Sequence, residues 1–382
     1  MNCKVMQVHH FRYGSSCGGV DRVVTELLEG SDDREVVLFE VGEWKDRTLT
    51  YKKNDGLSIY RRRLRGAVES EPLAKKIIVW LEFILTLLQL ILVIKRERID
   101  VIHLHTLQNY HAYFVFLARL RVCPYIVTLH GSETLAFPQR AESQKRIWNK
   151  VLCYASVVTA VSLDLSKLAE EMFSLTKQPS VVYNGISSPE NESDIDLINR
   201  DGDEKVALCV GALRYIKGHD VAIRAWKLLH EKGFNTRLLI AGEGEYRRDL
   251  EKLIEELNCN NYVTLLGNLE HKIALSMIGQ ADLFVMPSRT EGLGVTLIEA
   301  MALETPICAS DLNVFKEMVS DKESANLFCV GVPESLAQVA TKVLSNTEET
   351  KKMTRSAQRR YGDKFTRNAM VETYKKLYRS IL

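Results

Sequence analysis

The sequence predicts an α/β fold made of two doubly wound domains, each with a mostly parallel sheet. Three observations lead to this prediction. Short apolar runs alternate with helical patterns along the whole chain of 382 residues. Several of these runs are continuously apolar, as in strands that are buried on both faces of a parallel sheet. A polar, acidic segment at 187–204 then divides the series into two halves of ordinary domain size.

The first half contains six predicted strands separated by helical patterns. The strands are KVMQVHH (4–10), EVVLFE (35–40), DVIHLH (100–105), YIVTLH (125–130), SVVTAV (156–161) and SVVYN (180–184). The helical patterns lie near 20–29, 73–97, 108–121, 142–155 and 163–173. This order of elements predicts parallel strands joined by right-handed helical crossovers.

A second series of six strands begins at Lys205. It comprises KVALCVG (205–211), TRLLIAG (236–242), YVTLLG (262–267), DLFVMPS (282–288), PICAS (306–310) and ANLFCV (325–330). We therefore expect one domain over 1–190 and a second over 200–365, with a last helix at 366–382 packing back on the first. Ligands of open α/β sheets bind outside the carboxyl ends of the strands, so we expect a deep cleft between two facing domains.

The composition excludes several classes of protein. Hydrophobic residues make up 46% and charged residues 26%, with 51 basic against 49 acidic residues, which is the balance of a globular protein rather than a disordered one. A nucleic-acid partner is not expected without a large basic excess. Residues 1–185 hold 25 basic and 20 acidic residues, whereas the remainder holds 26 basic and 29 acidic residues. The net charges of the two halves therefore have opposite signs.

The cysteines indicate the compartment. None of the eight forms a C-x-x-C pair, and several lie inside apolar runs, which is typical of free thiols in a reducing compartment. The start MNCKVMQVHH lacks the apolar core of a signal peptide and is predicted to be a strand. A cytoplasmic location is therefore expected.

The segment from Ile77 to Ile94 has nearly the length of a membrane span, but Glu82, Thr86 and Gln89 interrupt it on one helical face. One interpretation is a long, mostly buried helix of the first domain. The other is peripheral contact with an anionic membrane face, in which the helix acts together with nearby cations. Those cations are Arg61, Arg62, Arg63, Arg65, Lys75 and Lys76.

Two motifs of the first half follow strands. Gly18 and Gly19 open a helix after the first strand, where backbone N–H groups can approach a phosphate, although a glycine pair is often only a turn. His130 ends a strand and is followed by Gly131, so its imidazole is expected in the ligand crevice. His103 and His105 share a strand face, and packed polar groups are favoured over a metal site there.

The second half opens with a candidate anion site. Gly211 follows its first strand, and Arg214 and Lys217 lie at the start of the next helix. N–H groups, the helix dipole and the two cations would all attract an anion there. The alternative is that Lys217 is an ordinary surface cation.

The sequence EGLGVTLIE at 291–299 is the most specific motif. Its glycines lead from a strand into a helix whose first N–H groups are available to an anion. Glu299 lies among apolar residues and therefore needs a polar partner, such as the hydroxyls of a sugar. The alternative is that Glu299 lies on a solvated face.

Taken together, these motifs resemble the retaining glycosyltransferases of family 4, which have the GT-B fold. The resemblance covers most of the chain and rests on the order of the motifs. They are GGV (18–20), DVIHLH (100–105), LHG (129–131), VS (161–162), YNG (183–185), VGALRYIKG (210–218), AGEGEYRRDL (241–250), LLGNL (265–269) and MPSRTEGLGVTLIEAMALETPI (286–307).

The resemblance implies a nucleoside-diphosphate sugar, UDP- or GDP-linked, held mainly by the second domain, and an acceptor held mainly by the first. It implies that Lys217 contacts the diphosphate, Glu291 the sugar hydroxyls, Glu299 the ribose, and His130 the region of the reacting carbon. Backbone amides of Gly292, Leu293, Gly294 and Val295 are implied to contact the phosphate and sugar. The implied donor site is completed by Gly18, Gly19, Gly211, Arg214 and Thr296. Catalytic roles fall to His130, Lys217 and Glu291.

The implied reaction is transfer of a hexosyl group, with retention and without a metal or other cofactor, to a glycan, glycolipid or polysaccharide-precursor acceptor. Polysaccharide or lipopolysaccharide biosynthesis is the expected context. The chain departs from the family pattern at Ala212, where arginine is usual, and at Leu293, where phenylalanine is commoner. It also departs at Glu304 and at Val314-Phe315, where glycines are usual. Arg214, two residues further on, is the candidate to replace the missing arginine; the alternative is a site with a changed diphosphate affinity or donor range.

Two other classes stay open. The first is another nucleotide-sugar enzyme of the same fold, such as an epimerase. The second is a binding scaffold with little or no activity, for which the loss of arginine at Ala212 is the argument. An NAD-dependent dehydrogenase is disfavoured because the G-x-G-x-x-G fingerprint is missing.

Overall fold

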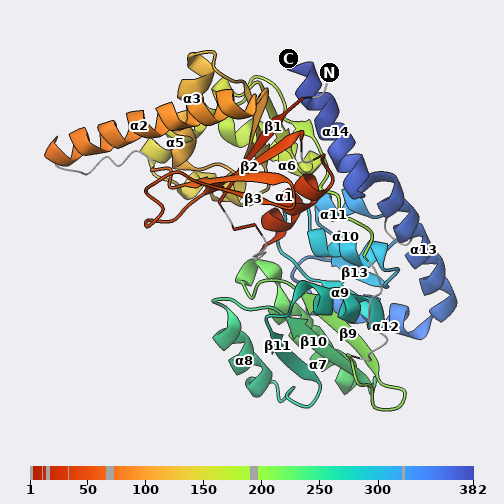
Figure 1. The fold of residues 1–382 in the computed structure, drawn as a ribbon. Helices are drawn as coiled ribbons and strands as arrows, with labels where there is room; N and C mark the ends of the chain where they lie inside the picture. The colour runs from red at the N-terminus through yellow and green to blue at the C-terminus, as the bar shows by residue number, and fades with distance from the viewer. Residues whose placement is uncertain are drawn as a thin grey trace. The chain divides into compact units, whose positions relative to one another are not determined.

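A computed structural model of the chain describes residues 3–10, 12–13, 18–32, 34–65, 73–189, 197–320 and 323–382, with the backbone alone at 73–76 and 347. The chain forms two compact units. The first consists of Met1–Gly185 together with Arg367–Leu382, and the second of Ile186–Thr366. Figure 1 shows the course of the chain. Both units are α/β with mainly parallel sheets, as predicted.

The first unit contains an eight-stranded sheet in the order β3-β4-β2-β1-β5-β6-β7-β8. Its strands are β1 (Val5–His9), β2 (Val36–Val41), β3 (Thr50–Asn54), β4 (Leu57–Arg62), β5 (Val101–His105), β6 (Tyr125–Leu129), β7 (Val157–Ala160) and β8 (Ser180–Val181). Every residue of β1, β2, β5 and β6 is buried, which explains their continuous apolar runs. All six predicted strands are present.

The hairpin of β3 and β4 was not predicted. Its strands pair antiparallel, and all five residues of β3 are exposed. A polar edge strand lacks the apolar alternation that marks a strand in the sequence, and its lysines protect the sheet edge. The turn did leave a signal, because Asp55 and Gly56 have φ values of 46° and 94° and D-G favours this two-residue turn.

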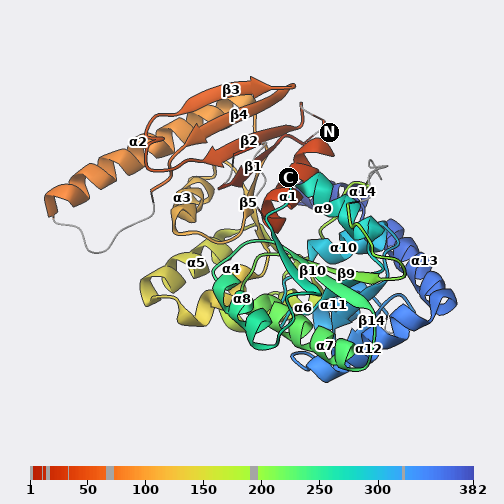
Figure 2. The same ribbon diagram turned by 90° about the horizontal axis from the view of Figure 1, so that it is seen from below.

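The helices of the first unit pack on both sides of this sheet (Figure 2). They are α1 (Gly19–Glu29), α2 (Leu73–Glu97), α3 (Ala112–Arg119), α4 (Ser132–Ala136), α5 (Glu142–Tyr154), α6 (Leu163–Phe173) and α14 (Arg367–Ser380), with short 3-10 helices at Asn109–His111 and Phe137–Gln139. The five helical patterns predicted in this half lie at these positions.

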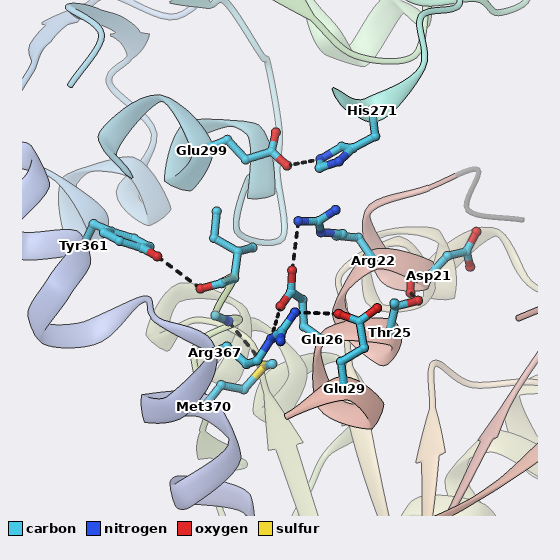
Figure 3. A network of polar contacts seen from close by, with 12 residues as sticks. Asp21, Arg22, Thr25, Glu26, Glu29, His271, Glu299, Tyr361, Arg367 and Met370 are labelled. Atoms are coloured by element: carbon cyan, nitrogen blue, oxygen red, sulfur yellow. Dashed lines mark hydrogen bonds and ion pairs between the residues drawn. The ribbon is translucent and has the colours of Figure 1, made fainter. Parts of the chain in front are cut away.

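The last helix, α14, belongs to the first unit and is joined to α1 by ion pairs (Figure 3). The guanidinium group of Arg367 contacts Glu26 at 2.5 Å and Glu29 at 2.6 Å. Glu26 is 1% exposed and also pairs with Arg22 at 2.9 Å. Two guanidinium groups therefore compensate a carboxylate that would be costly to bury alone.

The prediction that α2 is mostly buried was wrong. Within Ile77–Glu97, the one stretch of the described residues long and apolar enough to cross a membrane, 22% of the most apolar 18-residue window is buried. Large apolar side chains that are 45–65% exposed are Ile77, Ile78, Trp80, Leu81, Ile84, Leu85, Leu88 and Leu92. The apolar pattern therefore marks a helix with one large exposed apolar face rather than a core helix.

The arginines near α2 also differ from the sequence interpretation, in which they form a basic surface. Arg62 is 3% exposed and donates to Thr86 Oγ1 at 3.1 and 2.9 Å. Arg61 pairs with Glu40 and Asp46 at 3.2 and 3.1 Å, and Arg65 pairs with Glu82 at 3.6 Å.

The other three cations of the sequence interpretation are Arg63, Lys75 and Lys76. The guanidinium group of Arg63 lies 3.8 Å from the ring centroid of Trp44. The side chains of Lys75 and Lys76 lie outside the described ones. Most of the described arginines are thus engaged within their own unit, so they do not form the predicted membrane-facing surface.

The second unit contains a six-stranded parallel sheet in the order β11-β10-β9-β12-β13-β14. Its strands are β9 (Lys205–Val210), β10 (Thr236–Ala241), β11 (Val263–Gly267), β12 (Leu283–Met286), β13 (Ile307–Ser310) and β14 (Asn326–Phe328). Its helices are α7 (His219–Glu231), α8 (Arg247–Glu256), α9 (His271–Gln280), α10 (Val295–Ala302), α11 (Asn313–Met318), α12 (Pro333–Ser345) and α13 (Thr347–Lys364), with a short 3-10 helix at Tyr215–Lys217.

The predicted linker, 187–204, is only partly described. Residues 197–204 lie against the second unit, since the backbone N–H of Leu197 donates to Gln280 at 2.9 Å. The guanidinium group of Arg237 donates to the carbonyl oxygens of Ile198 and Asn199 at 2.8 and 2.9 Å.

The strand order reverses at β9, with β10 on one side and β12 on the other. This switch point is where ligands bind in such sheets.

Candidate active site

Lys217 follows β9, in the short 3-10 helix that leads into α7. Gly218 comes next with φ of 68°, and a Cβ atom there would lie 1.9 Å from the carbonyl oxygen of Pro287. A side chain at this position would collide with the backbone that follows β12. The glycine thus lets the Lys217 loop approach the loop that carries Glu291.

The ammonium group of Lys217 donates to Oε1 of Glu291. Ser288 Oγ donates to the same carboxylate oxygen at 3.0 Å. The three side chains line a small pocket at the carboxyl ends of β9 and β12, together with Cys209, Val210, His219, Val285, Met286 and Pro287. Charged and hydroxyl groups therefore meet at the switch point of the sheet.

His219 is a pocket residue that the sequence did not single out. It is 2% exposed, and its Nδ1 has no hydrogen-bond partner among the described residues. Burial, reinforced by the charge of Lys217, lowers the pKa of His219 to about 4. The imidazole is therefore neutral at neutral pH and adds no positive charge to the pocket.

The glycine loop leads from Glu291 into α10, as predicted. Gly294 is the N-cap of α10 with φ of 99°, and a Cβ atom there would lie 2.9 Å from Met286 Cε. Leu293 is buried and anchors the loop, while Val295 and Thr296 begin the helix. The first turn of α10 supplies N–H groups suited to an anion, and Gly292 precedes this turn.

Glu299 is buried in α10 and has the polar partner that its apolar surroundings require. Nε2 of His271, the first residue of α9, lies 2.8 Å from Glu299 Oε1 (Figure 3). The carboxylate is 4% exposed, whereas the His271 side chain is 37% exposed. The interpretation of Glu299 as a solvated face residue was wrong, and His271 is a neighbour that no motif indicated.

Gly211 and Arg214 lie in the loop between β9 and the 3-10 helix of Lys217, but Arg214 is not among the residues that line the pocket. Its side chain is 55% exposed and contacts Glu245 at 3.7 Å. A different arginine is ordered here: Arg289 pairs with both carboxylate oxygens of Asp220 at 2.8 and 2.7 Å. This pair joins the start of α7 to the loop after β12, which the sequence did not reveal because its partners lie 69 residues apart.

In the first unit, Gly18 is the N-cap of α1 and Gly19 is its first residue, as the glycine pair predicted. Asp21, in the first turn of that helix, contacts His9 Nε2 at 2.8 Å. His9 ends β1, and its ring centroid lies 5.9 Å from that of His105. The start of α1 thus adjoins a cluster of histidines.

His130 follows β6 and belongs to this cluster. Its Nε2 lies 3.3 Å from Nδ1 of His105, and its backbone N–H donates to Glu133 Oε1 at 2.6 Å. Its Nδ1 is buried and has no hydrogen-bond partner among the described residues. His103 and His105 are both buried and hydrogen-bonded, as expected of packed polar groups.

A chain of hydrogen bonds fixes the tautomer of His130. Nε2 of Gln7 donates to the Tyr378 hydroxyl at 3.3 Å, so Oε1 of Gln7 accepts from His105 Nε2 at 2.9 Å. In a neutral imidazole the other nitrogen then accepts. His105 Nδ1 therefore accepts from Nε2 of His130, which leaves Nδ1 of His130 as an acceptor.

Both imidazoles are neutral at neutral pH. Burial, followed by the neighbouring His9, lowers the pKa of His130 to about 3. Burial and the adjacent histidines lower the pKa of His105 well below its usual value. The cluster therefore presents a neutral acceptor atom rather than an imidazolium ion.

Comparisons with known proteins identify the class. Residues 17–188 match the family described as Glycosyltransferase Family 4, and residues 190–360 match Glycosyl transferases group 1. The solved structure of the Anabaena protein HepE in complex with UDP aligns with a TM-score of 0.79 at 16% identity, over 99% of this chain and 100% of that one. The fold is that of the GT-B glycosyltransferases.

Curated relatives agree with this class. An uncharacterized glycosyltransferase of Methanocaldococcus jannaschii is 29% identical over 65% of this chain and 67% of its own length. The O-antigen chain mannosyltransferase C of Escherichia coli is 20% identical over 99% of both chains. The chain belongs to the family 4 glycosyltransferases with the GT-B fold.

Proposed function

We propose that the protein transfers a hexosyl group, with retention, from a nucleoside-diphosphate sugar to a hydroxyl group of a glycan or lipid-linked glycan. The observation that carries the proposal is the meeting of Lys217, Ser288 and Glu291 beside the first turn of α10. A cation and helix N–H groups suit a diphosphate, and a carboxylate suits sugar hydroxyls. UDP- and GDP-linked sugars are the donors we expect.

The proposed chemistry is a same-face substitution. The bond from the anomeric carbon to the diphosphate oxygen breaks, and the acceptor oxygen bonds to that carbon on the same face. The acceptor proton passes to the leaving phosphate. Lys217 and the N–H groups at the start of α10 would stabilise the charge gained by the diphosphate, so no metal is needed in this proposal. Glu291 and Glu299 bind the donor and are not the acid–base pair of a glycosidase.

His130 has a defined part in this proposal. As a neutral imidazole with an acceptor at Nδ1, it would accept a hydrogen bond from a donor sugar hydroxyl. It would add no positive charge next to an oxocarbenium-like transition state. This role follows from the resemblance together with the tautomer described above.

The acceptor class and the location are also proposals. The similarity to an O-antigen chain mannosyltransferase supports a polysaccharide or lipopolysaccharide precursor as acceptor. The seven described cysteines are free thiols, which supports a cytoplasmic location. Arg214, at the edge of the loop, would reach the diphosphate only by leaving Glu245.

A donor and acceptor panel tests the proposal. The protein is incubated with UDP-, GDP- and ADP-linked hexoses, with and without glycan and lipid-linked acceptors, and free nucleoside diphosphate is measured. Release that requires an acceptor, with an unchanged anomeric configuration in the product by NMR, is expected. A nucleotide sugar converted to its epimer without acceptor would favour the epimerase. Binding without turnover across the panel would favour the scaffold.

A further inference from the structure

Helix α2 presents an apolar surface that its own unit does not cover. The side chains of Ile77, Ile78, Leu81, Ile84, Leu85, Leu88 and Leu92 are exposed at helical spacings of three or four, with Trp80 beside them. In both views the N-terminal half of α2 extends away from the sheet of its unit (Figures 1 and 2). A contiguous apolar surface of this kind marks an interaction site.

This surface extends onto α3. The ring centroid of Phe116 lies 5.2 Å from that of Phe83, and Phe116 and Leu120 are 38% and 60% exposed. Tryptophan is common where a helix meets the lipid headgroup region, because its ring is apolar and its N–H is polar. We define the α2 surface as the eight exposed side chains of α2 together with Phe116 and Leu120.

The opposite face of α2 is held in the unit. Thr86, Leu90, Val93 and Ile94 are at most 3% exposed, and Thr86 accepts two hydrogen bonds from the buried Arg62. Phe83 stacks on Tyr113 of α3 at 4.3 Å between ring centroids. A helix that crossed a bilayer would have to give up these contacts, so the structure favours a helix that lies along a surface.

Charges distinguish the possible partners. The segment 73–121 contains seven basic and three acidic residues. Each carboxylate is bonded within the unit: Glu82 to Arg65, Glu97 to Lys4 at 2.9 Å, and Asp100 to the backbone N–H of Lys4 at 2.8 Å. Five exposed basic residues lie at or just after the C-terminal ends of α2 and α3. They are Lys95, Arg96, Arg98, Arg119 and Arg121. The charge around this surface is therefore complementary to an anionic partner.

A second copy of the chain is a poorer partner. Basic residues flank α2 at both ends, with Lys75 and Lys76 before the apolar stretch and Lys95 and Arg96 after it. A symmetric pair of α2 helices would bring cationic ends together whether the helices ran parallel or antiparallel. An anionic bilayer offers apolar chains for the side chains and negative headgroups for the rim.

We propose that the α2 surface docks the first unit on an anionic lipid bilayer, with α2 lying in the plane of one leaflet. Arg61 and Arg62, two of the six cations named in the sequence interpretation of membrane contact, are not part of this surface. The lipid acts as a platform and not as the acceptor of transfer. The proposal is independent of the proposed reaction, and its test does not measure turnover.

Vesicle sedimentation tests the docking. The full chain is mixed with vesicles of phosphatidylcholine alone or with phosphatidylglycerol. Strong binding to the anionic vesicles, weakened at least about tenfold by Leu81→Ser/Leu85→Ser/Leu88→Ser, is expected. A matched control replaces Leu163, Met172 and Leu382, which are 41%, 37% and 66% exposed outside the α2 surface, and should bind like the wild type. Absence of wild-type binding, or equal loss in both triple variants, would overturn the proposal.

Trp80 gives a second measurement, in which one conservative variant separates its signal from those of the other three tryptophans. Its fluorescence should be quenched by brominated phosphatidylglycerol, and the quenching should be greater for bromines near the headgroups than for those at the chain ends. Trp80→Phe should remove it. Circular dichroism checks the fold of each variant. The alternative partner is a second copy of the chain. It would be shown if the wild type were dimeric by light scattering and bound no vesicles, and if the triple α2 variant were monomeric.

Discussion

Lys217 donates a hydrogen bond to the carboxylate of Glu291, although the two residues lie 74 positions apart in the chain. The approach depends on Gly218, because a side chain there would collide with Pro287. The cation proposed for the donor diphosphate and the carboxylate proposed for the donor sugar are thus a single ion pair. A bound donor would have to satisfy both charges at once, which couples recognition of its two halves.

Removing either charge should slow transfer strongly without unfolding the protein. Lys217→Ala and Glu291→Gln are each expected to lower kcat/KM for the donor by about 10²–10³, the usual loss when one preorganised electrostatic group is removed. Acceptor-dependent release of nucleoside diphosphate measures this. Lys227→Ala is the matched control, since Lys227 pairs with Glu231 on α7 at 3.5 Å and lies outside the pocket. A rate near that of the wild type in either variant would remove these roles.

Glu299 is expected to act in binding rather than in the chemical step. Glu299→Gln should raise KM for the donor about ten- to hundredfold with little change in kcat, because a hydrogen bond to a charged group is lost in ground and transition states alike. Steady-state kinetics with varied donor would measure both constants. Glu304→Gln, just beyond the same helix, is the control. A fall in kcat at unchanged KM would contradict this assignment.

The tautomer of His130 can be observed directly. Side-chain ¹⁵N NMR should show a protonated Nε2 and a bare Nδ1 in the wild type. Gln7→Met removes the acceptor that orients His105, so a mixture of His130 tautomers and a rate lower by about tenfold are expected. Tyr378→Phe removes the hydroxyl that orients the Gln7 amide, so a mixture of His130 tautomers is expected in this variant as well. A wild type with its proton on Nδ1 would refute the hydrogen-bond chain.

Buried histidines should make the protein less stable in acid. Burial, with a contribution from His9, lowers the pKa of His111 to about 3 from an ordinary value of 6.5. Between these values the unfolded chain binds more protons than the folded one, so the free energy of unfolding falls as pH decreases. The Tm should drop by several degrees from pH 7.5 to pH 5. His111→Asn should show a smaller drop, and an equal drop would exclude His111 as a source.

Glu304 occupies a position that favours glycine. It follows the C-terminus of α10 with φ of 54°, and the N–H groups of Glu304 and Thr305 donate to Met301 and Ala300 at 3.4 and 3.1 Å, the Schellman pattern. Glu304→Gly should therefore raise the free energy of unfolding by about 1 kcal/mol. Chemical denaturation measures the gain, and Glu304→Ala, which keeps a Cβ atom, should show none.

Periodic and continuous apolar patterns made most of the fold predictable. Strands such as β5 and β12 are buried along their whole length, so their sequences indicate them without any partner. The β3–β4 hairpin escaped because its outer strand is exposed and polar. The environment of α2 was misjudged because an apolar helix has the same composition in a core and on an uncovered surface.

The candidate site was likewise only partly predictable from the sequence. Lys217, Glu291, Glu299 and His130 follow strands at fixed spacings, so the chain order indicates them. Their partners come from distant segments: His271 reaches Glu299 from α9, and Gln7 orients His105 from β1. Pairings of this kind have no local signature in the sequence. The exposed position of Arg214 was equally hidden, because its contact with Glu245 joins two separate loops.

The discontinuity of the first unit has a consequence for biosynthesis. The second unit is a continuous segment, 186–366, and can fold as soon as that segment has left the ribosome. The first unit has to wait for residues 367–382, which bring Arg367 to the buried Glu26 and Tyr378 to Gln7 and His103. The half of the enzyme that is synthesised first is therefore completed last, and a nascent chain stalled before Arg367 would expose an unfinished histidine cluster to chaperones and proteases.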